Sequence, residues 1–473
     1  MLKRKFFYWL TISNFLYIIV LLILAGVTIA TLTGDNGILT RTQDAKNRTE
    51  EAEREEKEKL GDMEDIIDEY AVGIKIEQVT DENPGVLEGT GTYDNPYTIN
   101  SIEDLVFFSY DVNAGNTYEG QTVKLALSLD FNSNKSYVDP LRADYGKYGY
   151  DGELKTLLTT GEGFNPIGTY LNTNTSVADE TNTPFMGTFD GDGHEIDGMR
   201  IVSEEKGKGL FGLVKSATIK NLGIGKNCII SAATSYGSIT GYAYLDSRIE
   251  ACYNKAEISS SSTNIAGIVG SVTAGCSVTD CYNIATINGQ NAVGGIVGSN
   301  SGTISNCYNI AIINGESSAG GIAGENYGAI SECYNSGDIY VDTTNAGGIS
   351  GINTNGTISN CYNIATVTGT MTVVGGIVGN MSGDDAKISN SYNIRIITSV
   401  HGTGGGIVAA FQGGILENNY TLENIINNSN GYITSGISIK NSEELMGLAN
   451  ILGNAFKEDT NDINNGYPIL NWQ

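Results

Sequence analysis

The sequence predicts an all-β chain whose larger part is a parallel β-solenoid, and two repeated patterns carry this prediction. The first is the tripeptide Cys-Tyr-Asn, which begins at Cys252, Cys281, Cys307, Cys333 and Cys361 and whose tyrosine continues as Tyr392 and Tyr420. The second is a Gly-Gly-Ile-Val-Gly-like block before the later copies, at Gly294 to Gly298, Gly320 to Gly324, Gly347 to Gly351 and Gly375 to Gly379. Successive tyrosines lie 26 to 30 residues apart. A constant period of this length marks stacked structural repeats.

Within one period the pattern is that of short strands. Between Ala292 and Gly315 the chain reads Ala-Val-Gly-Gly-Ile-Val-Gly, then Gly-Thr-Ile-Ser-Asn-Cys-Tyr-Asn, then Ala-Ile-Ile-Asn-Gly. Three short strands separated by Gly, Asn and Ser turns fit this pattern, whereas a helix would need about a dozen residues with a 3.6-residue period. One coil cannot bury its own apolar face, so it must stack on the next, and a three-sided solenoid is expected. The glycines suit corners that need either a positive φ or a close approach between coils.

The glycine-rich block resembles the GLUG repeat of bacterial surface and secreted proteins, which include the non-catalytic part of immunoglobulin A peptidases. The resemblance covers residues 205 to 426, and shorter motifs extend it upstream to residue 89. These motifs are Gly89-Thr-Gly-Thr, Asn95-Pro-Tyr, Ser101-Ile-Glu-Asp-Leu, Pro166-Ile-Gly, Gly187-Thr-Phe-Asp-Gly, Gly209-Leu-Phe-Gly and Ile219-Lys-Asn-Leu-Gly. The resemblance implies a right-handed parallel β-helix in an extracellular setting, and by itself it implies no activity.

The N-terminus predicts a transmembrane signal-anchor over residues 1–34. The basic run Lys3-Arg-Lys precedes an uncharged stretch from Phe6 to Leu32, which is long enough to cross a bilayer of roughly 30 Å at about 1.5 Å per residue. Basic residues on the near side predict an N-inside, C-outside orientation. A cleaved signal peptide with Thr28-Ile-Ala at its cleavage site is the alternative, although the apolar run is longer than such peptides need.

The stretch from Leu21 to Leu39 resembles the pilin-like N-terminal segment of many clostridial surface proteins. In that family a glycine after the basic cluster marks the prepilin cleavage site, and a glutamate follows soon afterwards. Here Phe6-Phe-Tyr-Trp follows Lys5, and no acid occurs before Asp35. The resemblance therefore implies a degenerate pilin-like segment, and it favours membrane anchoring over incorporation into a pilus.

Four further regions follow the anchor. A charged helical stalk and linker is expected over residues 35–82, because Glu50 to Leu60 carries mixed charges at three- and four-residue spacing. The remaining regions are an N-terminal cap and lead-in region of the β-helix over residues 83–204, the repeat solenoid over residues 205–430 and a C-terminal cap over residues 431–473. Short capping helices are expected from Asn100 and from Asn441, because each asparagine begins a run of polar and acidic residues that leads into apolar ones.

Five of the seven cysteines occur at the same phase of successive coils, so they are expected to form a column with neighbours about 4.8 Å apart. Buried free thiols are the favoured interpretation, because stacked side chains point in parallel and free cysteine is often buried. Disulfides and a metal site are the alternatives. The seventh cysteine leaves at least one thiol unpaired within a monomer.

The column also predicts a bend in the chain. Ile304 and Cys307 have opposite parity on one strand, so both can face inward only if the strand bends between them. We expect this bend near Asn306, with Tyr308 partly exposed. The residues that follow the tyrosines are then expected to form an asparagine ladder at a corner, and they include Asn283, Asn309, Asn335 and Asn363.

Candidate catalytic groups are sparse. The chain has two histidines, and Gly198 stands where a zinc-peptidase motif beginning at His194-Glu195 would need its second histidine. Asp190 to Asp197 resembles a calcium loop, but Glu195 occupies the position at which an EF-hand needs glycine. A β-turn is the favoured interpretation; calcium binding, or a carboxylate pair of Asp190 and Asp192 in a glycan-acting enzyme, are the alternatives. The sequence thus predicts no catalytic, metal-binding or cofactor-binding residues.

The net charge of the chain limits the classes of partner that it can bind. Acidic residues outnumber basic ones 54 to 27, and the net charge of −27 argues against nucleic acid as a partner. We expect a membrane-tethered extracellular repeat protein of a Gram-positive bacterium, non-enzymatic, with a role in surface adhesion or structural spacing. Its expected partners are the membrane, through the N-terminal helix, and a host or cell-wall glycan or protein. The alternatives are a polysaccharide-acting β-helix enzyme with acids in residues 133–184 and a pilin-like fibre subunit.

Overall fold

The computed structural model describes residues 87–132, 163–170, 182–202, 206–231, 234–371, 373–427 and 435–473. Leu87–Gln473 form a compact unit. The predicted membrane anchor and stalk lie outside the described residues, as does most of the segment 133–184. Within the described ranges, no helix is both long and apolar enough to span a membrane.

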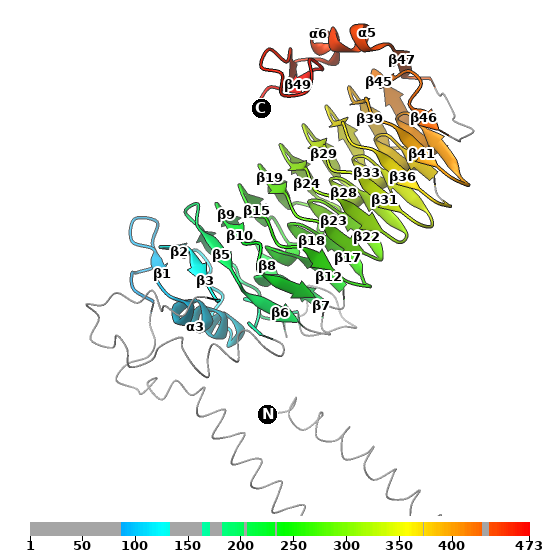
Figure 1. Ribbon diagram of the computed structural model, residues 1–473. Helices are drawn as coiled ribbons and strands as arrows, with labels where there is room; N and C mark the ends of the chain where they lie inside the picture. The colour runs from blue at the N-terminus through cyan, green and yellow to red at the C-terminus, as the bar shows by residue number, and fades with distance from the viewer. Residues whose placement is uncertain are drawn as a thin grey trace, which may run out of the picture. The chain divides into compact units, whose positions relative to one another are not determined.

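Five parallel sheets run along the solenoid, and each coil contributes one short strand to each sheet (Figure 1). Sheet 1 consists of β1 (Tyr97–Ile99), β2 (Thr122–Leu125), β4 (Thr188–Asp190), β9 (Thr218–Lys220), β14 (Arg248–Glu250), β19 (Ser277–Thr279), β24 (Thr303–Ser305), β29 (Ala329–Ser331), β34 (Thr357–Ser359), β39 (Lys387–Ser389) and β44 (Ile415–Glu417). Sheet 2 consists of β3 (Leu129–Asp130), β5 (Glu195–Asp197), β10 (Gly223–Ile224), β15 (Tyr253–Asn254), β20 (Tyr282–Asn283), β25 (Tyr308–Asn309), β30 (Tyr334–Asn335), β35 (Tyr362–Asn363), β40 (Tyr392–Asn393), β45 (Asn419–Leu422) and β47 (Ile437–Lys440).

The other three parallel sheets are shorter. Sheet 3 consists of β6 (Arg200–Val202), β11 (Ile229–Ser231), β16 (Ile258–Ser259), β21 (Ile287–Gly289), β26 (Ile313–Gly315), β31 (Ile339–Val341), β36 (Val367–Gly369), β41 (Ile397–Ser399) and β46 (Ile426–Asn427). Sheet 4 consists of β7 (Lys206–Lys208), β12 (Thr234–Gly237), β17 (Thr263–Ala266), β22 (Asn291–Gly294), β27 (Ser318–Gly320), β32 (Asn345–Gly347), β37 (Val373–Gly375) and β42 (Thr403–Gly405). Sheet 5 consists of β8 (Phe211–Lys215), β13 (Thr240–Tyr244), β18 (Val269–Val272), β23 (Val297–Asn300), β28 (Ala323–Asn326), β33 (Ser350–Thr354), β38 (Val378–Ser382) and β43 (Val408–Gln412).

Each coil passes through sheets 4, 5, 1, 2 and 3 in this order, and the eight strands of sheets 4 and 5 define eight coils between Lys206 and Asn427. The predicted parallel β-solenoid is therefore confirmed. The expectation of three strands per coil is wrong, because two of the three expected strands are each divided by a bend. In the coil from Asn291 to Gly315, these bends fall at Gly295-Ile296 and at Asn306-Cys307. The right-handed sense of the helix stays a prediction.

The bend at Asn306 has the form that the column of cysteines requires. Asn306 has a φ of +54°, a left-handed conformation that asparagine tolerates better than most residues. Ile304 and Cys307 on either side of it are both fully buried, and Tyr308 is half-buried. The predicted bend is therefore confirmed. The equivalent residues of other coils also have positive φ, among them Asp280, Glu332, Asn360, Asn390 and Asn418.

The paired glycines serve close packing between coils. Gly294 and Gly295 do not belong to the residues with positive φ. A Cβ atom on Gly295 would lie 2.1 Å from the carbonyl oxygen of Gly321 in the next coil. Of the two roles that the sequence left open for these glycines, close approach of the backbones is therefore the one that applies.

Helices are present at both positions where the sequence predicts them. Helix α3 (Ile102–Asn113) begins after Ser101, whose side chain accepts a hydrogen bond from the backbone N–H of Asp104. Helix α5 (Ser442–Met446) begins with a capping box in which Asn441 and Glu444 bond each other's backbone. Helix α6 (Ala449–Leu452) and the antiparallel pair β48 (Phe456–Lys457) and β49 (Ile469–Leu470) complete the C-terminal region.

Candidate functional site

A stack of tyrosine rings forms the outer surface of sheet 2. Within sheet 2, the strands β15, β20, β25, β30, β35 and β40 each begin with a tyrosine. These strands pair in register, so the rings lie above one another. The stacked residues are Tyr253, Tyr282, Tyr308, Tyr334, Tyr362 and Tyr392. Neighbouring ring centroids are 5.0 to 5.1 Å apart, and the angle between neighbouring ring planes is 2° to 11°. We call this surface, together with the residue two positions after each tyrosine, the tyrosine face.

An asparagine ladder lies directly beneath the tyrosine face. In each coil the residue after the tyrosine points inward, and its amide Nδ2 donates to Oδ1 of the asparagine in the next coil at 2.8 to 2.9 Å. The members are Asn254, Asn283, Asn309, Asn335, Asn363 and Asn393, and all are fully buried. Each amide also bonds the backbone two residues further along its own chain, as Asn309 does with both the N–H and the carbonyl of Ala311. The predicted asparagine ladder is therefore confirmed, and it holds the strands of sheet 2 in register.

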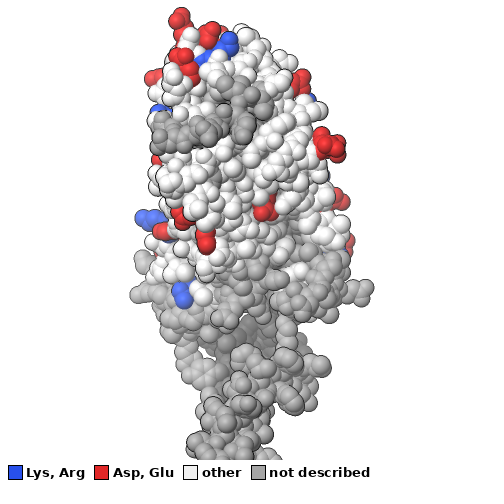
Figure 2. Space-filling view, turned by 90° about the vertical axis from the view of Figure 1, so that its right-hand side faces the viewer, with Lys and Arg blue, Asp and Glu red and all other residues white. Residues whose placement is uncertain are grey.

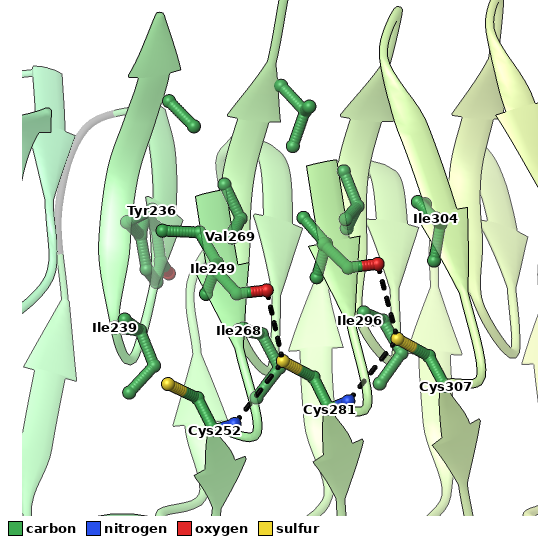
Figure 3. Close-up of a cluster of buried hydrophobic side chains, with 14 of the residues drawn as sticks. Tyr236, Ile239, Ile249, Cys252, Ile268, Val269, Cys281, Ile296, Ile304 and Cys307 are labelled. Carbon is green, nitrogen blue, oxygen red and sulfur yellow. Dashed lines mark hydrogen bonds between the residues drawn. The ribbon is translucent and has the colours of Figure 1, made fainter. Parts of the chain in front are cut away.

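The cysteine column forms a second internal ladder (Figure 3). The thiol of Cys307 donates to the carbonyl of Ser305 at 3.1 Å, and its sulfur accepts from the backbone N–H of Cys281 at 3.4 Å. All seven cysteines are free and buried, so the predicted free-thiol column is confirmed and a disulfide column is not formed. Burial disfavours the thiolate, raising the pKa of the Cys307 thiol well above its usual value.

Ser391 shows what the ladder requires of its members. It follows Cys361 in the column, where its hydroxyl donates to the carbonyl of Ser389 at 2.9 Å and accepts from the N–H of Cys361 at 3.1 Å. A serine hydroxyl therefore finds both a donor and an acceptor at this position. This position in the column therefore needs a small side chain that both donates and accepts a hydrogen bond. The reactivity of a thiol is not needed for this role.

We therefore expect Cys307→Ser to be tolerated better than Cys307→Ala. Serine keeps both hydrogen bonds and should cost about 1 kcal/mol or less, whereas alanine leaves the buried N–H of Cys281 without its acceptor and should cost about 2–3 kcal/mol. The sequence alone suggests the opposite order, because a buried hydroxyl without a partner is costly. Urea denaturation of the two variants measures the difference, and an equal or larger loss in the serine variant would contradict the ladder.

The C-terminal region packs on the side of the solenoid, over one end of the tyrosine face. The indole of Trp472 lies 5.8 Å from the ring centroid of Tyr334 and 6.1 Å from that of Tyr308, and its Nε1 donates to the carbonyl of Glu332 at 3.1 Å. The Tyr362 hydroxyl donates to Oε1 of Gln473 at 2.9 Å, and the Tyr392 hydroxyl donates to the carbonyl of Pro468. Burial under this region raises the pKa of Tyr362. The C-terminal region therefore covers the face from Tyr308, which only Trp472 contacts, to Tyr392.

The other part of the tyrosine face is uncovered and apolar. Tyr253 and Tyr282 are half-buried, and the side chains of Ile284 and Ile310 are 38% and 47% exposed. The isoleucines at the same position in later coils, Ile364 and Ile394, pack against the C-terminal region instead. Lys255 and Ser336 occupy this position on either side of the exposed pair. Two exposed isoleucines thus continue a surface that the chain itself uses for packing.

The acidic turn at Asp190 is a structural turn between β4 and β5. Asp190 accepts from the N–H of Asp192 at 3.0 Å and forms an ion pair with Lys220 at 3.1 Å. Asp192 pairs with Lys124 at 2.8 Å, and Glu195 pairs with Lys255 at 2.6 Å. The predicted β-turn is therefore confirmed, and lysines of other coils neutralise the carboxylates of Asp190, Asp192 and Glu195. In the part of the chain that the structure describes, no group of three His, Cys, Asp or Glu residues could hold a metal ion.

Two features of the structure were not anticipated. A second asparagine ladder joins Asn300, Asn326 and Asn353 in sheet 5, with Nδ2 to Oδ1 distances of 2.8 and 2.7 Å. Its signal is present in the sequence, since each asparagine lies six residues after the first glycine of the glycine-rich block. The packing of Trp472 on the tyrosine face has no such signal, because the C-terminal region belongs to no repeat.

Comparisons with known proteins add little to this description. No protein-family model and no curated protein sequence matches the chain. A crystal structure from Bacteroides ovatus, provisionally described as an immunoglobulin A1 protease, is similar with 20% identity and a TM-score of 0.36. The similarity covers 83% of this chain and 97% of the other. At this level of similarity we transfer no property from that protein, and the resemblance to GLUG repeats stays a prediction.

Proposed function

We propose that this chain is a non-enzymatic surface protein that is anchored in the membrane by its N-terminus and binds a partner on the outside of the cell. The observation that carries the proposal is the uncovered part of the tyrosine face, at Tyr282, Ile284 and Ile310. Contiguous exposed apolar residues on a soluble surface often mark an interaction site. Repeated coils supply the length that separates such a site from the membrane.

The chemistry of the solenoid supports recognition by apolar contact and hydrogen bonding. The side shown in Figure 2 carries few charged residues among the described ones, although the whole chain has a net charge of −27. The carboxylates of the acidic turn are paired with lysines, so they are poorly placed to act as a free acid and base. A host or cell-wall glycan or protein fits such a surface. The polysaccharide-acting enzyme and the pilin-like fibre subunit are the competing proposals.

Protease shaving of intact cells tests the location. We expect peptides from residues 205–430 to be released, while residues 1–40 stay with the membrane fraction, because the basic run at Lys3 predicts an N-inside orientation. Peptides of a cytosolic marker should stay inside the cells as the control. Recovery of the full-length chain from the cytosol would contradict the proposal.

A glycan and protein array tests the binding surface. Residues 83–473 should bind at least one array member, and Ile310→Lys should weaken that binding at least tenfold. Lys255 occupies the position equivalent to Ile310 in another coil. The fold therefore accepts a lysine at this position, and the variant should fold normally. Ile229→Lys, which changes an exposed isoleucine elsewhere on the solenoid, is the matched control and should bind as the unchanged protein does. Equal binding by the Ile310 variant would place the site elsewhere.

A further inference from the structure

The docking site of Trp472 consists of groups that recur with the repeat. The indole lies beside the rings of Tyr308 and Tyr334, with its plane inclined by 26° and 28° to theirs, and its Nε1 donates to the carbonyl of Glu332. Tyr308 and Tyr334 are successive members of the tyrosine stack. Glu332 is the bend residue of the coil that contributes Tyr334. One coil, together with the tyrosine of the coil before it, therefore supplies every group that holds the indole.

Two further copies of these groups lie in the coils before Trp472. The first copy consists of Tyr253, Tyr282 and the carbonyl of Asp280, and the second consists of Tyr282, Tyr308 and the carbonyl of Asn306. The bend residues Asp280, Asn306 and Glu332 have φ values of +54°, +54° and +52°, and the strands on both sides of them pair in register. The three carbonyls therefore take equivalent positions in their coils.

The polar groups of both copies are available to a partner. Within the described residues, the carbonyls of Asp280 and Asn306 accept no hydrogen bond, and the hydroxyls of Tyr282 and Tyr308 make none. In the covered part of the tyrosine face, two tyrosine hydroxyls donate to oxygen atoms of the C-terminal region. The two copies thus offer the same kinds of donor and acceptor that the C-terminal region uses.

The form of the tyrosine stack limits what can bind there. Neighbouring rings are nearly parallel and 5.0 to 5.1 Å apart, so each ring covers the face of the next and leaves its edge and hydroxyl outside. A sugar that stacks on an aromatic ring needs a free ring face. An indole can instead lie along the ring edges and donate its N–H to a bend carbonyl, as Trp472 does. The stack therefore favours an aromatic side chain over a sugar.

Apolar residues beside the two copies favour a protein segment as the source of this side chain. Ile284 and Ile310 are exposed next to them. The equivalent Ile364 and Ile394 pack in one cluster with Leu470, two residues before Trp472. A segment with an apolar residue close to a tryptophan can therefore contact both the isoleucines and the tyrosine stack.

We propose that the uncovered part of the tyrosine face binds a tryptophan-bearing segment of another protein, with the indole held as Trp472 is held. This inference rests on the proposed function, since it names the class of partner for the same surface. In the second copy the indole would lie one coil, about 4.8 Å, from Trp472, a distance at which aromatic rings stack favourably. The first copy lies one coil further from the C-terminal region.

A peptide with the sequence of residues 466–473, Gly-Tyr-Pro-Ile-Leu-Asn-Trp-Gln, is the probe. It carries a fluorescent label and is titrated with residues 83–473, of which residues 87–473 form a compact unit. Fluorescence anisotropy should show saturable binding. Trp472→Ala in the peptide should weaken this binding at least about tenfold, and Trp472→Phe should weaken it less, because phenylalanine keeps an aromatic ring but has no N–H donor.

Tyr282→Ala in the protein tests the location, because both copies share this ring. It should weaken peptide binding at least about fivefold. The groups that hold Trp472 are unchanged in this variant. The fold accepts a residue without a ring in this row, since Gly223 pairs in register with Tyr253. Tyr340→Ala, which removes a tyrosine that is 42% exposed on sheet 3, is the matched control and should bind the peptide unchanged. Circular dichroism should be the same for both variants.

No binding at about 1 mM peptide would overturn the inference. Equal binding of the alanine peptide, or unchanged binding by Tyr282→Ala, would overturn it as well. A glycan whose binding on the array requires Tyr282, without any binding of the peptide, would show that the partner class is wrong while the proposed binding surface stands. The failure of the inference is thereby separate from a failure of the proposed function, which the array and Ile310→Lys test.

Discussion

Alanine in place of Gly295 should destabilise the solenoid by about 3 kcal/mol or more, because the added methyl group has no space. Its Cβ would lie 2.1 Å from the carbonyl oxygen of Gly321 and 2.7 Å from Cβ of Asn309. The first of these atoms is backbone of the next coil, so it can move only if the two coils separate. The second belongs to the buried asparagine ladder, so it can move only if ladder hydrogen bonds break. Urea denaturation, followed by circular dichroism, measures the loss.

Gly447→Ala is the control for this substitution. A Cβ on Gly447 would meet nothing closer than 3.7 Å, so its effect should stay within about 0.5 kcal/mol. Hydrogen exchange should show the damage of Gly295→Ala concentrated in the coils around it, because each coil contacts only its neighbours. If the two alanine variants have the same stability, the close approach of the coils at Gly295 is not what the structure describes.

Alanine in place of Asn309 is the second change with a large expected effect. The side chain makes four hydrogen bonds in the core: with Asn283 and Asn335 in the adjoining coils, and with the N–H and carbonyl of Ala311. Its loss leaves the buried backbone groups of Ala311 without these partners. At about 1–3 kcal/mol for each buried group without a partner, we expect a total loss of about 3–5 kcal/mol.

Asn314→Ala provides the comparison within the same coil. Asn314 is half-exposed, and its amide makes one hydrogen bond, to Oδ1 of Asn288 at 2.7 Å. Its replacement should cost about 1 kcal/mol or less, since water can replace the lost bond. Thermal unfolding of both variants checks the difference. A similar small effect for Asn309→Ala would show that the ladder does not stabilise the solenoid.

The repeated residues could be predicted from the sequence because each repeat is an independent observation of the same environment. The constant phase of Cys307 and Asn309 with their counterparts was sufficient to predict both ladders, and the parity conflict between Ile304 and Cys307 located the bend at Asn306. The number of strands per coil was predicted wrongly, because a bend inside an expected strand divides it into two, as happens at Gly295 and at Asn306.

The parts of the structure outside the repeats were harder to predict. Asn441 signals a helix through local capping, and that helix is present. The contact of Trp472 with the tyrosine face joins residues that are far apart in the sequence, and no local rule specifies such a contact.

Thiol labelling of the native protein tests most directly whether the coils stack with their repeated residues inside. We expect a maleimide reagent to label none of the seven cysteines within minutes in the native state, because all seven are buried. All seven should react once the chain is unfolded in denaturant without a reducing agent, because none forms a disulfide. Rapid labelling of Cys252, Cys281, Cys307, Cys333 and Cys361 in the native state, or fewer than seven labels after unfolding, would contradict the stacked solenoid with its buried thiol column.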